Sequence, residues 1–228
     1  METPLSVIAN VSKVVTKVID RVMGDRVEVP LMVCGAVVHA LKLNGIESRI
    51  MYGPVAWIEI LEDNTPFWAG CWGDHFSFWV ATQYGEIVDL NTSAAYRKEV
   101  HAKLGQNAIV STPMIWSNEV PAFYRCKPEG VAVADPTDPK DIEKYQKILA
   151  EIEEKCAPRK PAEGVTATAA VPADVNEADF ANEAIVCPNR RILDDSKNSF
   201  RIFDRALSVF GLPPPPKGIS TKRDLIRL

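Results

Sequence analysis

The sequence predicts an α+β fold in which N-terminal helices pack on an antiparallel sheet. Apolar residues recur at a spacing near 3.6 over residues 5–23, which indicates an amphipathic helix. A second apolar stretch begins near Cys34 and stops at Asn44-Gly45, a pair typical of helix ends. Short apolar runs then follow one another without a helix between them, and this pattern predicts antiparallel strands.

Four short runs account for the predicted strands, and they cover residues 48–52, 55–61, 75–82 and 86–90. Three residues separate the last two runs, a length that fits a hairpin loop. Closure of this hairpin would bring Asp89 to the level of Phe78 or Trp79. Because side chains alternate along a strand, His75, Ser77 and Trp79 are expected on one face.

The remainder of the chain predicts two more helices and two proline-containing segments. A helix is expected over 94–104, and another over 138–156, with Asp138 as N-cap and Pro139 in the first turn. A last helix is expected near 196–210, before the proline tract 213–216. The sequence thus predicts a core domain over 1–156, an Ala/Pro-rich linker over 157–179 and a helical extension with the proline tract over 180–228.

Composition excludes several classes of protein. The chain has 228 residues, 46% of them hydrophobic, and a net charge of -4, which argues against a nucleic-acid partner. Neither a secretory leader nor an apolar run long enough to cross a membrane is visible. Five cysteines at irregular spacing, without a CxxC pair, indicate reduced thiols. We therefore expect a cytoplasmic protein with no membrane partner.

One cysteine and one histidine stand out as candidates for nucleophilic chemistry. A helix N-terminus would favour the thiolate of Cys34, and such a nucleophile needs a base. His39 lies five residues later on the same helix and points about 140° away. His101 lies in a charged, surface-like segment. His75, at the start of an aromatic strand, is the better candidate, and Asp89 could orient it.

The stretches "VCGAVVHALKLNGIESRIMYG" and "HFSFWVATQYGEIVDLNTS" resemble the core of the transglutaminase-like superfamily, over residues 30–92 or so. The resemblance implies a papain/transglutaminase-like fold in which Cys34 is the nucleophile, His75 the base and Asp89 the orienting carboxylate. It implies acyl transfer to an amine or hydrolysis of an amide, on a peptide, protein or small amide substrate, without a cofactor or metal. Two features depart from the family pattern: Ser77 replaces an aromatic residue, and residues 62–74 form an unusual insertion.

The residues expected to bind substrate lie in and around this insertion. Trp57, Trp68 and Trp72 could line an acyl-substrate cleft, with Ser77 beside them, and Trp68 and Trp72 are expected in a loop. The backbone N–H of Cys34 would bind the oxyanion, and a tryptophan indole N–H is a candidate for the second donor.

Three alternatives remain open from the sequence. Cys34 falls on an apolar stripe with Val37, Val38 and Leu41, so it could be a buried core thiol. The chain could then be a catalytically inactive binding or assembly module, with the proline tract docking a partner. A zinc site at Cys71 and His75, with Asp74 or Asp89, is disfavoured because the ligand spacing is loose.

Overall fold

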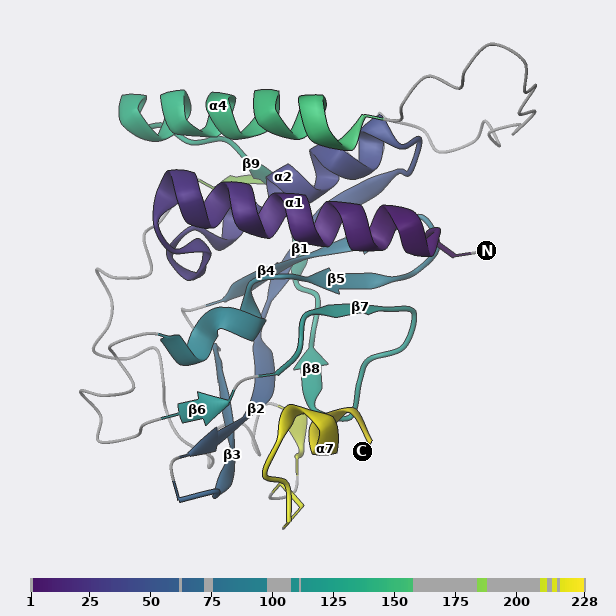
Figure 1. The fold of residues 1–228 in the computed structure, drawn as a ribbon, viewed down its shortest axis with the longest axis vertical. Helices are drawn as coiled ribbons and strands as arrows, with labels where there is room; N and C mark the ends of the chain where they lie inside the picture. Colours follow the sequence, from purple (N-terminus) through teal and green to yellow (C-terminus); the bar gives the residue numbers. More distant parts are fainter. Residues whose placement is uncertain are drawn as a thin grey trace.

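A computed structural model of the chain shows an α+β architecture of helices and mostly antiparallel sheets (Figure 1). The residues that it describes are 2–61, 63–71, 76–97, 108–110, 112–157, 184–187, 210–212, 215–216 and 218–227. Three helices gather on one side of a six-stranded sheet, and a four-stranded sheet lies on the other side (Figure 1).

The helical layer consists of α1 (Leu5–Met23), α2 (Pro30–Leu43) and α4 (Pro139–Cys156). The apolar face of α1 is buried, as its 3.6-residue period predicts. The end of α2 is also as predicted: Gly45 adopts a left-handed conformation, and its N–H donates to the Lys42 carbonyl. Asp138 caps α4 through Lys140, which confirms the predicted start of that helix.

The six-stranded sheet, here called sheet A, has the order β10-β9-β1-β4-β5-β7. Its strands are β1 (Ser48–Gly53), β4 (Ser77–Thr82), β5 (Ile87–Asp89), β7 (Ile115–Ser117), β9 (Gly130–Ala134) and β10 (Ala184–Cys187). All neighbours pair antiparallel except β9 and β10, which are parallel.

The predicted hairpin between β4 and β5 is confirmed. Val80 pairs with Val88 and Ala81 with Ile87, so the register carries Asp89 to the level of Trp79. Phe78 and Val80 face the helical layer, and Trp79 faces the second core. The alternation expected for this strand is therefore correct where the structure describes it.

The four-stranded sheet, here called sheet B, is centred on β2. It contains β2 (Val55–Leu61), β3 (Pro66–Cys71), β6 (Ala108–Val110) and β8 (Tyr124–Cys126). Only Pro54 separates β1 from β2, so the chain passes here from sheet A to sheet B. A Cβ on Gly53 would lie 2.1 Å from the Lys127 carbonyl oxygen, which is why glycine stands at this crossing.

Sheet B corrects two expectations. The four predicted strands do not form one antiparallel sheet, because β2 leaves the sheet that contains β1 and β4. Trp68 lies in β3 and not in a loop, since β3 pairs along its whole length with β2.

The predicted helix over 94–104 begins as the 3-10 helix η2 (Thr92–Arg97), and residues 98–104 lie outside the described part.

The described segments of residues 180–228 pack with both sheets. Strand β10 extends sheet A, and the short helix α7 (Lys222–Ile226) lies beside sheet B (Figure 1). Leu212, Ile219 and Leu225 are buried in the core that lines sheet B. Residues 158–179 of the predicted linker and 196–209 of the predicted helix lie outside the described residues.

Candidate active site

Cys34 lies in the second turn of α2, which corrects the expectation that this helix begins near the cysteine. Pro30 is the first helical residue, where its fixed φ and missing N–H cost nothing. The Val33 N–H already donates to the Val29 carbonyl, so the i to i−4 pattern has begun before Cys34. The N–H of Cys34 is therefore used within the helix and is not free for an oxyanion.

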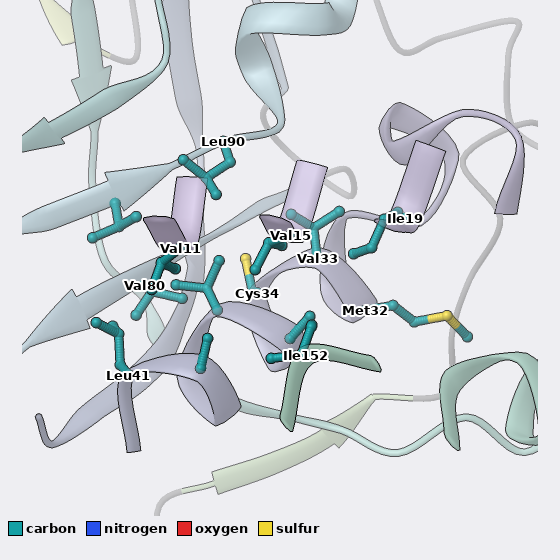
Figure 2. Packing of buried hydrophobic residues seen from close by; sticks show 14 of the residues in the cluster. Val11, Val15, Ile19, Met32, Val33, Cys34, Leu41, Val80, Leu90 and Ile152 are labelled. Atoms are coloured by element: carbon teal, nitrogen blue, oxygen red, sulfur yellow. The ribbon is translucent and has the colours of Figure 1, made fainter. Parts of the chain in front are cut away.

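The Cys34 thiol is part of the core between the helical layer and sheet A. Its side chain is 4% exposed and belongs to a cluster with Val15, Val33 and Val80. Figure 2 shows the sulfur surrounded by aliphatic side chains. Burial, and then the charge of Asp89, raise the pKa of Cys34 well above its ordinary value, so this arrangement favours the neutral thiol.

Asp89 ends β5 and is 2% exposed. Its Oδ1 accepts from the backbone N–H groups of Asn91 at 2.8 Å and Thr92 at 2.9 Å. Its Oδ2 accepts from the Thr92 hydroxyl and from the Tyr124 hydroxyl, the latter at 2.8 Å. Four donors thus surround the carboxylate, about as many as its lone pairs can accommodate.

A buried arginine holds the loop that follows Asp89. Arg26, in the 3-10 helix η1 (Arg26–Glu28), donates through Nε to the Leu90 carbonyl at 2.9 Å. It also pairs with Asp20 at the end of α1 and lies 3.4 Å from the Ser93 hydroxyl. The guanidinium thereby ties the helical layer to the turn that carries the Asp89 hydrogen bonds.

Two tyrosines and a second cysteine share the electrostatic environment of Cys34 and Asp89. Asp89 raises the pKa of Cys126 and of Tyr124, although burial has the larger effect on both. Burial and then the electrostatic effect of Cys34 raise the pKa of Tyr145, a residue of α4. The fold therefore brings together groups from α2, β5, β8 and α4.

The tyrosine of α4 meets α2 at the residue directly after Cys34. A Cβ built on Gly35 would lie 2.0 Å from the Tyr145 hydroxyl oxygen and 2.5 Å from Cβ of Ala134. Only glycine fits at this position, because the phenol and β9 press directly on the helix backbone. Tyr145 is half-buried, whereas Asp89 and Tyr124 are fully buried.

The predicted base, His75, lies outside the described residues, and so does Trp72. The insertion 62–74 is described over 63–71, most of which is β3. His39 points elsewhere, as expected, because its Nε2 lies 3.1 Å from Glu153 on α4. His101 is also outside the described part.

The predicted substrate-binding residues that can be located are all buried. Ser77 is 7% exposed at the start of β4, and Trp57 and Trp68 lie in the core that lines sheet B. The Trp57 indole N–H donates to Glu59 at 2.6 Å. This indole is therefore occupied, which removes Trp57 as the second oxyanion donor.

Four residues around the candidate site were not identified from the sequence: Thr92, Tyr124, Cys126 and Tyr145. Tyr145 lies within the helix predicted over 138–156, but nothing in the sequence marked it as part of a site. Asp89 itself was a usable signal, since an Asp often closes a turn by accepting from the backbone N–H two residues on, here that of Asn91. Tyr124 belongs to a strand that no clear alternation predicted.

Other kinds of site find no support in the part of the chain that the structure describes. No group of three or more potential ligands gathers there for a metal ion. The zinc alternative also needed Asp74 and His75, which are outside that part. None of the described helices has the length and apolar character needed to cross a membrane. The four cysteines with described side chains are free thiols.

Comparison with known proteins identifies no family for this chain. No family model matches it, and no curated protein does. A solved chain described as the crystal structure of genomics APC5867 is similar with a TM-score of 0.36 and 12% sequence identity, over 68% of this chain and 82% of that one. A likeness this low carries no argument about activity.

Proposed function

We propose that the chain performs thiol-dependent acyl transfer or amide hydrolysis, with Cys34 as the nucleophile, in a core that resembles papain/transglutaminase-like enzymes. One observation carries the proposal. Cys34 and Asp89 are far apart in the sequence, yet they lie close enough for the carboxylate to raise the pKa of the thiol. These are two of the three residues that the resemblance named, and they lie on α2 and at the end of β5.

Because the pKa of the Cys34 thiol is raised, the site is consistent with only one form of this mechanism. A neutral thiol requires that its proton leave as the carbonyl is attacked, so His75 would act as a general base and not as the partner of a preformed thiolate. The sulfur–carbon bond forms while the carbonyl oxygen becomes an oxyanion. Collapse of this intermediate expels the amine, which takes the proton back, and leaves a thioester on Cys34. Water or a second amine then releases the acyl group.

A second candidate function, a non-catalytic binding or assembly module, is favoured by the packing. Cys34 lies in an aliphatic cluster, and an imidazole could bond to Asp89 only by replacing one of its four donors. In this alternative, Cys34 is a core residue, and Asp89 serves to cap η2.

Acetylation by p-nitrophenyl acetate distinguishes the two functions. The chain is exposed briefly to the ester, and the acetyl group is located by peptide mass. The acyl-transfer proposal predicts acetyl-Cys34 in the unaltered chain and at least ~100-fold slower formation in His75→Ala. Acetylation confined to other residues, or an equal rate in His75→Ala, would instead favour the non-catalytic module. His39→Ala is the matched control and should leave the rate unchanged.

A further inference from the structure

The backbone N–H groups of α2 near Cys34 are not available to bind the oxyanion of the proposed reaction. Because α2 begins at Pro30, the N–H groups of Cys34 and Gly35 fall within the regular i to i−4 pattern. A tetrahedral intermediate on Cys34 would place a full negative charge on oxygen inside an apolar core, where an unsatisfied charge is costly. A side-chain donor must therefore supply the hydrogen bond.

Several polar side chains near Cys34 are already committed. The hydroxyls of Tyr124 and Thr92 donate to Asp89, and the Trp57 indole donates to Glu59. Tyr145 differs from them in two respects. Its hydroxyl oxygen lies against the backbone of Gly35, the residue next to the candidate nucleophile. It is also half-buried, whereas Tyr124, Thr92 and Trp57 are buried.

We propose that Tyr145 is a catalytic residue whose hydroxyl donates a hydrogen bond to the oxyanion formed when Cys34 attacks a carbonyl. The proposal rests on the proposed acyl-transfer function and deepens it, because it also places the approach of the substrate between α2, α4 and β9. The electrostatic contact between Cys34 and Tyr145 is consistent with this placement. Gly35 then has a function besides packing: its missing side chain lets the phenol reach the helix backbone.

Two reactions of the same thiol separate an oxyanion donor from a packing residue. Acetylation by p-nitrophenyl acetate passes through an oxyanion: sulfur bonds to the carbonyl carbon, the proton leaves to a base, and p-nitrophenolate departs. Alkylation by iodoacetamide is a direct displacement of iodide at a saturated carbon and forms no oxyanion. Tyr145→Phe should therefore slow acetylation of Cys34 by ~10²-fold, the usual effect of removing one such donor. It should leave alkylation of Cys34 within about twofold of the unaltered chain.

The outcomes are distinguishable from one another. Equal losses in both reactions would overturn the proposal, because Tyr145 would then govern only access or packing. Unchanged acetylation in Tyr145→Phe would overturn it as well. Persistence of all acetylation in Cys34→Ala, or no acetylation of Cys34 in the unaltered chain, would overturn the acyl-transfer function itself. Tyr84→Phe is the matched control, since Tyr84 is also partly buried against the same core and should change neither rate.

Discussion

Tyr124 donates a hydrogen bond to Asp89 at 2.8 Å, and this contact links sheet B to sheet A. Both residues are buried, and the tyrosine is completely excluded from solvent. A hydrogen bond to a buried carboxylate stabilises the fold more than one between neutral groups. The acidic member of the candidate triad is therefore also a structural link between the two sheets.

Removal of this hydroxyl tests the link. Tyr124→Phe should lower the free energy of unfolding by about 1.5–3 kcal/mol, because a buried carboxylate loses one of its four donors. Urea denaturation followed by fluorescence measures the change. The control is Tyr84→Phe, which removes a hydroxyl from a half-buried ring and should cost less than about 0.5 kcal/mol. Equal losses in both variants would contradict a special role for the Tyr124 hydroxyl.

The charge of Asp89 can be detected through a thiol other than Cys34. Burial and then Asp89 raise the pKa of Cys126 to about 12, while burial alone raises the pKa of Cys156. Asp89→Asn removes the charge, lowers the pKa of Cys126 and increases its thiolate fraction at pH 9. Alkylation of Cys126 by iodoacetamide should then become severalfold faster, with Cys156 unchanged. Similar acceleration at both thiols would indicate general loosening of the fold.

Glu59 predicts a dependence of stability on pH. Burial raises the pKa of this carboxyl from 4.5 to about 7, against the opposing effect of the Trp57 hydrogen bond. The folded state thus holds a proton that the unfolded state releases, so the contribution of Glu59 is fully present below pH 4.5 and is lost as the pH rises to about 7.

The variant Glu59→Gln isolates this contribution, since its amide oxygen can still accept from Trp57. Between pH 4.5 and about 7, the unaltered chain should lose up to about 3 kcal/mol of unfolding free energy relative to Glu59→Gln. Urea denaturation at pH 5 and pH 8 measures the difference. Parallel curves for the two proteins would show that Glu59 does not titrate differently in the folded and unfolded states.

The substitution Gly35→Ala tests how closely α4 packs on α2, and we expect it to change stability in the direction opposite to most Gly to Ala substitutions in helices. Gly to Ala within a helix normally adds about 1 kcal/mol of stability. Gly35→Ala should instead destabilise the fold by about 1–3 kcal/mol, because its Cβ would meet the Tyr145 hydroxyl and Ala134 at less than van der Waals distance. Thermal denaturation shows whether the variant is less or more stable than the unaltered chain. A more stable Gly35→Ala protein would mean that α4 does not press on α2 at this point.

Local patterns predicted much of the fold. The period of α1, the N-cap of α4 and the β4–β5 hairpin depend on neighbouring residues, and each was predicted with nearly correct bounds. The start of α2 was misjudged, because a proline is compatible both with an extended segment and with the first turn of a helix, and Pro30 is in fact the first helical residue. The division into two sheets was missed because it depends on a crossing at Gly53 and Pro54, whose cause is a distant backbone contact with Lys127.

The candidate site was predicted only in part for a similar reason. Cys34 and Asp89 came from the resemblance and from the hairpin register, which are both readable along the chain. The donors around them come from other segments: Tyr124 lies on β8, and Tyr145 lies on α4. The apolar stripe around Cys34 offered burial of the thiol as an alternative, but the residues that cover it come from α1 and sheet A, which are distant in the sequence.

The most direct test of the central claim compares two pH profiles at Cys34 in the unaltered chain. If a base removes the proton of a neutral thiol during attack, acetylation by p-nitrophenyl acetate should rise as an imidazole loses its proton, near pH ~6.5, and then level off. Alkylation by iodoacetamide should instead keep rising beyond pH 9, since it depends on the free thiolate of a group whose pKa is raised. Profiles that coincide, both rising beyond pH 9, would contradict the account, because Cys34 would then react as an unassisted buried thiol.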